Sequence, residues 1–361
     1  MGNLKRLEVW YHGRLVGFLA ITNDGICTFE YSGSFLSDGF SLSPFELPLQ
    51  TGVFVAKYHP FEGGFGVFDD SLPDGWGLLI LDRYLQSVGV KISELNLLDR
   101  LALVGSAGRG ALEFVPDRSV SPPSQVADIE FLAKEAASLL TEKNYSGHNI
   151  EELYQRGGSP GGARPKVFIK SEGREWLVKF PAKNDPETIG STEYKYALLA
   201  QRCGIDMPEV RLFDGKFFGA QRFDRILGEK LHVVSMAGLL RADYRTPCID
   251  YWHVFQVSMA LSHDINELWR VYKLMCFNCL IGNKDDHAKN FSFVFADGNW
   301  RLSPAYDLLP SEGMGGYHTT TINDSITPNK HDLLALAVKA GLPEKTAENV
   351  FEKMNETINS L

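Results

Sequence analysis

The sequence is poor in cysteine and basic residues, and it contains no long apolar run. Five cysteines are scattered along 361 residues, which is typical of a reducing compartment and argues against a disulfide framework. The chain offers no stretch of eighteen apolar residues for a transmembrane helix, and its N-terminus lacks the apolar stretch of a signal peptide. We therefore expect a cytoplasmic protein with no membrane partner.

The shortage of positive charge limits the classes of partner. With 36 Lys and Arg against 45 Asp and Glu, the formal net charge is −9. This charge argues against an extended basic surface that neutralises many phosphates, so we expect no general nucleic-acid binding by this chain alone. The 44% hydrophobic content is that of an ordinary globular protein, and 361 residues suffice for two or three domains.

Cys276 and Cys279 are the cysteine pair whose spacing suggests a metal motif. They lie in an apolar helical run, and no second Cys or His pair stands at zinc spacing. We interpret them as core thiols rather than metal ligands.

The N-terminal part has the pattern of a small β-rich unit. Alternating apolar residues predict strands at Arg6–Tyr11, Val16–Ile21 and Cys27–Tyr31, in a meander or small barrel. A helical stripe follows the motif Asp74-Gly75-Trp76-Gly77. The polar, proline-bearing stretch Pro116–Ser124 has the composition of a linker, and we place a domain boundary there.

Beyond this linker, mixed elements precede a part in which long helical patterns dominate. The turn Asp297-Gly298 is a strong signal for a type I′ hairpin. The predicted elements are helices over Ile129–Thr141, about Glu187–Cys203 and Glu344–Leu361, and strands over Lys166–Lys170, Trp176–Phe180, Phe291–Ala296 and Asn299–Leu302.

The polar loop Gly282–Asn290 carries the clearest chemical pattern. The D-x4-N spacing of Asp285 and Asn290, with Asp307 beyond a hairpin, is that of a kinase catalytic loop and its metal-binding Asp. Asp285 is suited to orient an acceptor hydroxyl and take its proton, and Asn290 and Asp307 offer the hard oxygen ligands that Mg²⁺ prefers. Lys289 would neutralise phosphate charge in the transition state. The alternative interpretation is a charged surface turn.

Three earlier segments match the order of a kinase N-lobe. The loop Gly157–Lys166 is rich in glycine, which lets backbone N–H groups approach phosphate, although this composition also suits a flexible turn. Lys179 stands within an apolar strand, either at a sheet edge or as the partner of Glu193 on the next helix, as in protein kinases. Gln221–Phe223 either form a hinge whose backbone pairs with adenine or are an ordinary strand end.

With these segments in order, the chain resembles the HipA family, the kinase toxins of HipBA-type toxin–antitoxin modules. The resemblance covers nearly the whole chain. The motifs that carry it are Phe68–Gly77, Val104–Leu112, Gly161–Lys166, Arg222–Arg225, Gly282–Asn290 and Pro304–Asp307. It implies an α+β, protein-kinase-like two-lobed fold: an accessory α/β subdomain over residues 1–118, a mixed N-lobe over 119–228 and a mainly helical C-lobe over 229–361.

The resemblance also implies residue roles and the cofactors ATP and Mg²⁺. Asp285 would be the catalytic aspartate, with Lys289 beside it, and Asn290 and Asp307 would bind the metal. Phosphate on Ser159, the implied autophosphorylation site, would add about −1.5 to −2 charge to the phosphate-binding loop and inactivate the enzyme. The implied ATP contacts are Gly161, Gly162, Ala163, Arg164, Pro165, Lys166, Lys179, Gln221, Arg222, Phe223, His287, Ala288, Lys289, Asn290, Tyr306 and Asp307.

The partners implied by the resemblance are a HipB-like antitoxin, through which the chain would reach DNA indirectly, and a protein substrate of the aminoacyl-tRNA synthetase class, whose phosphorylation arrests growth. Two rival interpretations remain. One is a weakly catalytic co-repressor scaffold, against which the intact Asp285, Asn290, Asp307 and Lys179 argue. The other is a small-molecule or lipid kinase, although no basic amphipathic helix points to a membrane substrate.

Overall fold

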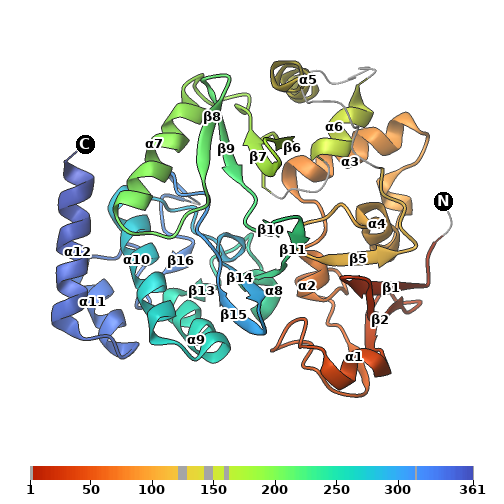
Figure 1. Ribbon diagram of the computed structural model, residues 1–361, viewed down its shortest axis with the longest axis horizontal. Helices are drawn as coiled ribbons and strands as arrows, with labels where there is room; N and C mark the ends of the chain where they lie inside the picture. The colour runs from red at the N-terminus through yellow and green to blue at the C-terminus, as the bar shows by residue number, and fades with distance from the viewer. Residues whose placement is uncertain (1–2, 121–127, 142–148, 158–161, 314, 361) are drawn as a thin grey trace. The chain divides into compact units, whose positions relative to one another are not determined.

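The structure is a computed structural model that describes residues 3–120, 128–141, 149–157, 162–313 and 315–360 (Figure 1). Contacts divide the chain into two compact units. Unit 1 comprises Met1–Ser191 and Val210–His232, and unit 2 comprises Thr192–Glu209 and Val233–Leu361. Among the described residues, no helix is long and apolar enough to span a membrane.

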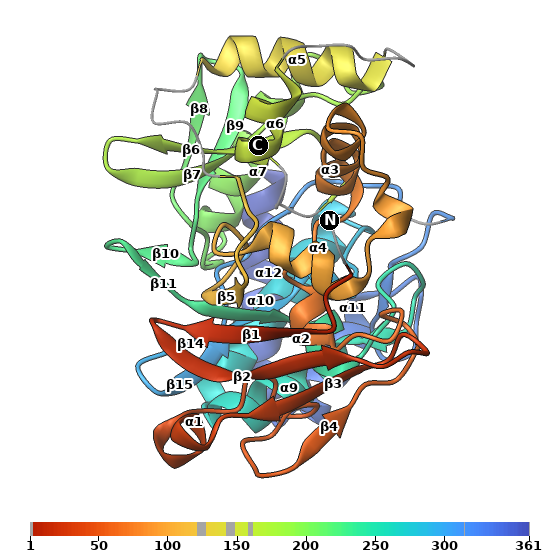
Figure 2. The ribbon, with the colours of Figure 1, turned by 90° about the vertical axis from the view of Figure 1, so that its right-hand side faces the viewer.

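Unit 1 begins with a five-stranded antiparallel sheet, and Figure 2 shows its strands β1, β2 and β3 running side by side across the view. The order β4-β3-β2-β1-β5 confirms the predicted meander, with β5 returning beside β1. The strands are β1 (Arg6–Tyr11), β2 (Arg14–Ile21), β3 (Cys27–Tyr31), β4 (Val53–Val55) and β5 (Leu112–Val115). All three strands predicted here are confirmed, although β2 starts two residues earlier than expected.

Short helices accompany this sheet. They are α1 (Gly33–Asp38), α2 (Gly66–Asp69), α3 (Gly75–Ser87), the 3₁₀ turn η1 (Ile92–Glu94) and α4 (Leu97–Val104). A reciprocal capping box between Asn96 and Asp99 starts α4, and every residue of that helix except Arg100 is buried. A short helix that is apolar on nearly all sides is stable because neighbouring elements cover it, which is the case here.

A second, four-stranded antiparallel sheet has the order β6-β7-β9-β8. Its register places Lys166 directly opposite Lys179 on adjacent strands, so the two side chains share one face. The strands of this part are β6 (Lys166–Ser171), β7 (Arg174–Lys179), β8 (Val210–Phe213) and β9 (Phe217–Gln221), followed by the small hairpin β10 (Arg225–Ile226) and β11 (Glu229–Lys230).

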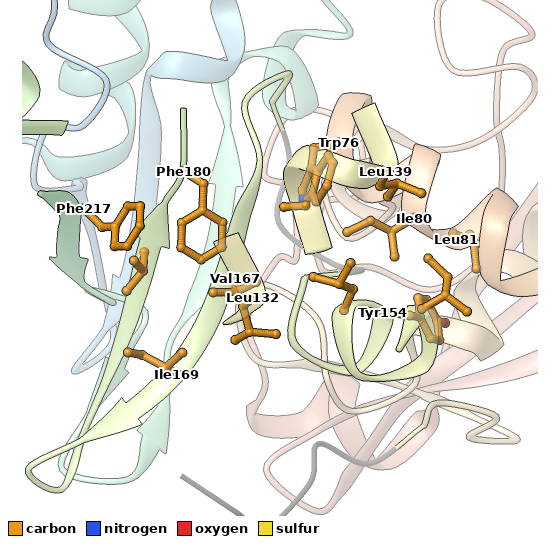
Figure 3. Close-up of a cluster of buried hydrophobic side chains, with 14 of the residues drawn as sticks. Trp76, Ile80, Leu81, Leu132, Leu139, Tyr154, Val167, Ile169, Phe180 and Phe217 are labelled. Atoms are coloured by element: carbon orange, nitrogen blue, oxygen red, sulfur yellow. The ribbon is translucent and has the colours of Figure 1, made fainter. Parts of the chain in front are cut away.

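One apolar core joins this sheet to three helices of unit 1: α3, α5 (Ile129–Thr141) and α6 (Ile150–Gly157). Figure 3 shows that core, which includes Trp76, Ile80, Leu81, Leu132, Leu139, Tyr154, Val167, Ile169, Phe180 and Phe217. Residues from both sides of the boundary predicted at 118/119 contribute to it. The contacts place both sides of this boundary in unit 1. The boundary at 118/119 stays a prediction.

Unit 2 is mainly helical, as expected for residues after Tyr251. Two elements, α7 (Ile189–Arg202) and β12 (His232–Ser235), cross the division between the units. The other elements are α8 (Met236–Leu240), β13 (Ile249–Asp250), α9 (Tyr251–Ser262), α10 (Ile265–Ile281), the 3₁₀ turn η2 (Ala288–Asn290), β14 (Ser292–Ala296), β15 (Asn299–Leu302), β16 (Thr320–Thr321), α11 (Lys330–Lys339) and α12 (Glu344–Asn359).

Two local features of unit 2 were predicted from the sequence and are confirmed. Asp297 and Gly298 have φ values of 53° and 76°, as a type I′ turn between β14 and β15 requires. Cys276 is 0% exposed in α10, so it is a core thiol whose pKa burial raises. Cys279, in the same helix, is partly buried, and burial raises the pKa of its thiol to about 12.

The shared core of unit 1 predicts the effect of a matched pair of substitutions in α3. Leu81 is 1% exposed and Leu78 is 37% exposed. We expect Leu81→Ala to lower the free energy of unfolding by about 2–5 kcal/mol through lost burial and a cavity, and Leu78→Ala to lower it by less than about 1 kcal/mol. Urea unfolding followed by tryptophan fluorescence measures both, since Trp76 and Trp176 lie in this core. Equal losses would contradict the packing described.

A buried histidine predicts how stability depends on pH. His232 is 1% exposed, its Nε2 atom lies 2.7 Å from the carbonyl oxygen of Leu42, and burial lowers its pKa to about 4. Because this pKa lies below the ordinary value near 6.5, the folded state binds fewer protons than the unfolded state between those pH values. The stabilisation is therefore fully present above pH about 6.5 and is lost as the pH falls toward 4.

We expect wild-type protein to lose about 3 kcal/mol more than His232→Gln between pH 7 and pH 4, because the glutamine keeps a donor near the Nε2 position but does not titrate. Urea unfolding of both proteins across this range measures the difference. Parallel stability curves would show that His232 does not titrate as described.

Candidate active site

The loop that carries Asp285 begins where α10 ends. Gly282 takes the left-handed conformation (φ 69°), and the N–H of Asn283 donates to the carbonyl of Asn278 at 2.8 Å, closing the helix. The buried Asn283 side chain then donates through Nδ2 to Asn278 Oδ1 at 3.0 Å and to the carbonyl of Asp307 at 3.1 Å. Asn283 thus connects the end of α10 with the backbone of the predicted metal-binding residue.

Asn290 closes the predicted catalytic loop on itself. Its Nδ2 atom donates to the carbonyl oxygen of Asp285 at 2.7 Å, and its N–H donates to the carbonyl of His287 at 2.8 Å, within the turn η2. Since Nδ2 serves this internal bond, the amide oxygen Oδ1 is the atom that Asn290 can offer to a cation. The carboxylate of Asp285 belongs to an exposed residue, as an acceptor-orienting group requires.

The strand pair β14–β15 returns the chain from Asn290 to Asp307. Next to Asp307, the hydroxyl of Tyr306 donates to the carbonyl of Lys289 at 2.7 Å and lies 2.6 Å from the hydroxyl of Ser292. Asp307 itself has a φ of +56°, a region that non-glycine residues seldom adopt. Backbone strain of this kind clusters at functional sites, where the surrounding contacts hold it in place.

Lys289 and His287 of the loop lie beside an aromatic ring. The Nζ atom of Lys289 lies 4.2 Å from the ring centroid of Tyr244, and the rings of His287 and Tyr244 lie 5.8 Å apart. Ala288, the first residue of η2, is 2% exposed and packs inside unit 2. The Lys289 side chain is therefore positioned by a cation–π contact within the loop region.

These contacts test whether unit 2 could hold Mg²⁺. Asn290 and Asp307 supply one amide and one carboxylate oxygen, and the described residues contain no cluster of three or more His, Cys, Asp or Glu that could hold a metal. Mg²⁺ usually keeps several waters and is bound through one or two protein oxygens together with substrate phosphates. The donor set therefore fits Mg²⁺ bound with a nucleotide, and it does not suit zinc.

In unit 1, the described part of the glycine-rich loop is attached to the start of α3. The N–H of Gly162 donates to the carboxylate of Asp74, and the carbonyl of Gly162 accepts from the N–H of Trp76 at 2.9 Å. The Trp76 indole donates to the carbonyl of Lys166 at 3.0 Å. The predicted Ser159 and Gly161 lie outside the described residues.

Gly75 permits this close contact. It has a positive φ of 44°, and a Cβ atom at this position would lie 2.6 Å from the carbonyl oxygen of Gly162. Any side chain at Gly75 would therefore push the loop away from α3. The motif Asp74-Gly75-Trp76, seen in the sequence only as part of a family resemblance, turns out to hold the loop.

The remaining predicted loop residues differ in their surroundings. Arg164 makes a bidentate ion pair with Asp185, at 2.9 and 3.3 Å, so its guanidinium braces the loop, and its predicted contact with ATP stays a prediction. Ala163 is exposed, and Pro165 is buried, with its carbonyl accepting from the N–H of Phe180 at 2.8 Å.

Two buried lysines face the same side of the β6–β7 pair. Lys166 is 5% exposed and Lys179 is 8% exposed, and they stand directly opposite each other. The Nζ atom of Lys166 would lie 2.6 Å from a Cβ built at Gly162, so this amine lies against the loop. Like charges opposite each other repel, so negative charge nearby stabilises such a pair. The phosphate-binding role of both lysines stays a prediction.

The predicted hinge is fixed by a buried ion network. The N–H of Arg222 donates to the carbonyl of Glu175 at 2.9 Å, so this N–H is used within unit 1. The guanidinium of Arg222 pairs with Asp224 at 2.7 Å, and Arg225 pairs with the same carboxylate at 2.9 Å. Burial alone raises the pKa of Asp224, but the two arginines outweigh burial and hold this pKa well below its usual range. Gln221, at the end of β9, pairs in register with Trp176.

Glu193 and Lys179 belong to different units. Glu193 is 4% exposed on the part of α7 that belongs to unit 2, whereas Lys179 is on β7 of unit 1. Beyond the C-terminal end of α7, Asp206 joins the chain to the rest of unit 2, because it pairs with Arg270 at 2.6 Å and its carbonyl accepts from the N–H of Ala305 at 2.7 Å. The ion pair between Glu193 and Lys179 stays a prediction.

Comparison with known proteins identifies the family to which the chain belongs. The family model of the HipA-like C-terminal domain matches residues 158–361, which is more than half of the chain, and that of the HipA N-terminal domain matches residues 7–115. The chain belongs to the HipA family. The Asp74 to Trp76 contacts thus run from the HipA N-terminal domain to the HipA-like C-terminal domain.

Relatives and a solved structure agree with this membership. The candidate kinase Y4dM of Sinorhizobium fredii is 26% identical over 98% of this chain and 89% of its own length. The serine/threonine-protein kinase toxin HipA of Shewanella oneidensis is 23% identical over 87% of this chain and 78% of its own length. The solved complex of Shewanella oneidensis HipA with HipB and operator DNA covers 98% of this chain and 91% of its own, at 21% identity and a TM-score of 0.74. The mixed α and β fold is therefore that of HipA.

The attachment of the loop to α3 predicts a local effect of removing Asp74. We expect Asp74→Ala to speed amide exchange in the segment Gly162–Lys166 about tenfold or more, because the Gly162 N–H loses a charged acceptor worth about 1.5–3 kcal/mol. Hydrogen exchange with mass spectrometry measures this. Asp82→Ala in the same helix is the matched control and should leave exchange in that segment unchanged. An unchanged rate in Asp74→Ala would mean that Asp74 does not hold the loop.

Proposed function

We propose that this chain is an ATP- and Mg²⁺-dependent serine/threonine protein kinase. The observation that carries the proposal lies within unit 2, where hydrogen bonds from Asn283 and Tyr306 tie the Asp285 loop to the segment around Asp307, and Asn290 closes that loop on Asp285. Phosphoryl transfer depends mainly on positioning and charge stabilisation, which such a fixed set of carboxylates and amides supplies. Membership of the HipA family and the relative named a serine/threonine-protein kinase toxin support the proposal.

In the proposed reaction, the exposed Asp285 carboxylate orients the hydroxyl of a protein serine or threonine. The hydroxyl oxygen bonds to the γ-phosphorus of ATP, and the bond from that phosphorus to the β–γ bridging oxygen breaks. The hydroxyl proton passes to Asp285 and then to solvent, and ADP leaves. Lys289 would stabilise the charge that develops on the transferred phosphoryl group.

The nucleotide and metal contacts follow from the same role. Asn290 Oδ1 and the Asp307 carboxylate would hold Mg²⁺, which when bound would neutralise phosphate charge. Lys166 and Lys179 would hold phosphates, with Glu193 orienting Lys179. Since the N–H of Arg222 is already used, we assign the adenine contacts to other backbone groups of Gln221–Phe223. The further proposed contacts are Gly161, Gly162, Ala163, Arg164, Pro165, His287, Ala288 and Tyr306.

Regulation and partners are proposed from the family. We propose that Ser159 is autophosphorylated and that its phosphate, inside the phosphate-binding loop, inhibits the kinase by repulsion. A HipB-like antitoxin is the proposed partner, because the similar HipA was solved with HipB and operator DNA. The proposed substrate is a protein of the aminoacyl-tRNA synthetase class, whose phosphorylation would arrest growth.

The proposed catalytic role predicts that Asp285→Ala slows phosphate transfer about 10²–10⁴-fold, the usual share of a general base. Incubation with labelled ATP in a host lysate, followed by mass spectrometry, measures transfer and identifies the target. Glu356→Ala, an exposed change on α12, is the control and should label like the wild type.

Equal labelling by wild type and Asp285→Ala would overturn the proposed mechanism. A thermal-shift measurement with ATP and Mg²⁺ distinguishes the kinase from the alternative of a co-repressor scaffold. A kinase is stabilised by the nucleotide whether or not Asp285 is present, whereas a wild-type protein that millimolar ATP does not stabilise would favour a co-repressor scaffold.

A further inference from the structure

Asp286, the neighbour of Asp285, is buried, whereas Asp285 faces solvent. The side chain of Asp286 is 0% exposed. A buried carboxylate is costly unless donors surround it, so its partners indicate what it does. The Asp286 carboxylate plays no part in the mechanism proposed above.

Most of the donors around Asp286 come from one short segment that follows Asp307 in the chain, and the hydroxyl of the buried Tyr251 also bonds to the Asp286 side chain. Its Oδ1 atom accepts from the N–H groups of Thr319 at 2.9 Å and Thr320 at 3.1 Å, and its Oδ2 atom lies 2.9 Å from Nδ1 of His318. An ionised carboxylate only accepts, so the tautomer of His318 that fits this pair is the one with a hydrogen on Nδ1. Three consecutive residues thus bond to one buried carboxylate.

The same segment also binds the backbone on both sides of Asp285. The carbonyl of Lys284 accepts from the N–H and the hydroxyl of Thr319, at 3.1 and 3.0 Å. The carbonyl of Asp286 accepts from the hydroxyl of Thr320. Asp285 is therefore held between two anchored neighbours.

The anchoring segment is itself fixed to the helical part of unit 2. Thr320 and Thr321 form β16, which pairs in parallel with Ile249 and Asp250 of β13. The Asp250 carboxylate caps α9 by accepting from the N–H of Trp252 at 2.7 Å, and it also accepts from the Thr321 hydroxyl at 2.6 Å. The contacts of Asp286 therefore lead to a rigid element rather than to another loop.

A nucleophilic role for these residues is the competing interpretation. Cys279 Sγ lies 3.9 Å from Nε2 of His318, so Cys279, His318 and Asp286 follow the order of a Cys-His-Asp triad. A reactive cysteine needs a lowered pKa, yet burial raises the pKa of this thiol to about 12. The geometry accordingly favours positioning over nucleophilic chemistry.

We propose that Asp286 and His318 are positioning residues that lock the Asp285 loop to the segment His318–Thr320, and so set where the Asp285 carboxylate points. This inference rests on the proposed role of Asp285. It implies that a buried carboxylate fastens the segment after Asp307. A displacement of about 1 Å at a reacting group can cost about a hundredfold in rate, so loss of the lock should reduce turnover.

The experiment compares three variants in unit 2. His318→Leu removes the donor to Asp286, His318→Asn keeps a donor near the Nδ1 position, and Thr319→Val removes only the hydroxyl that binds Lys284. We expect kcat for transfer from labelled ATP to fall about tenfold to a hundredfold in His318→Leu, to stay within about threefold in His318→Asn, and to fall by an intermediate factor in Thr319→Val. The KM for ATP should change little, since the proposed phosphate contacts are unaltered.

Two controls separate positioning from folding and from the proposed function. Thr357→Val, a change at a partly exposed residue of α12, should match wild type, and ATP-binding stoichiometry gives the folded fraction against which each kcat is normalised. In an Asp285→Ala background, adding Thr319→Val or His318→Leu should cause no further loss, because the lock acts through Asp285.

The outcomes are distinct. A normal kcat per folded molecule in both His318→Leu and Thr319→Val, with Asp285→Ala inactive, would overturn the positioning role and leave the kinase proposal standing. An active Asp285→Ala protein would overturn both. Should His318→Leu not fold, Thr319→Val and the additivity test decide the question.

Discussion

The hydrogen bond from Asn283 to the carbonyl of Asp307 is the constraint on which the candidate site depends. It joins the end of α10 to a residue that the β14–β15 hairpin brings back, and it helps to hold Asp307 in a strained backbone conformation. The carbonyl oxygen is the group held, which leaves the carboxylate for other contacts. A similar division operates at Asn290, where the amide nitrogen binds the loop and the oxygen is left for a ligand.

Hydrogen bonds within unit 1 also link the HipA N-terminal domain to the start of the HipA-like C-terminal domain. A loop built from glycines has few side chains with which to fix its own shape, so its order must come from outside. Here the carboxylate of Asp74 and the backbone and indole N–H groups of Trp76 supply that order. The N-terminal domain therefore helps to hold the loop. The linker-like composition of Pro116–Ser124 gave no sign of these contacts.

Sequence patterns predicted the features that depend on neighbours in the chain. The Asp297-Gly298 hairpin, the helix Ile129–Thr141 and the loop around Asp285 follow from local turn chemistry and spacing. Pairings between distant residues were not predictable, because tertiary packing decides them. Asp74 meets Gly162 across 88 positions, and His318 meets Asp286 across 32. Two adjacent aspartates look alike in sequence, and only burial separates an exposed carboxylate from a structural one.

Charge placement connects the two lysines of unit 1 with their proposed ligand. Lys166 and Lys179 stand opposite each other on one face, each less than 10% exposed, in a chain whose net charge is negative. Holding two ammonium groups there disfavours the folded state unless negative charge lies nearby. The strand pair begins at the glycine-rich loop, and under the proposed function the phosphates of ATP would bring further negative charge beside both amines.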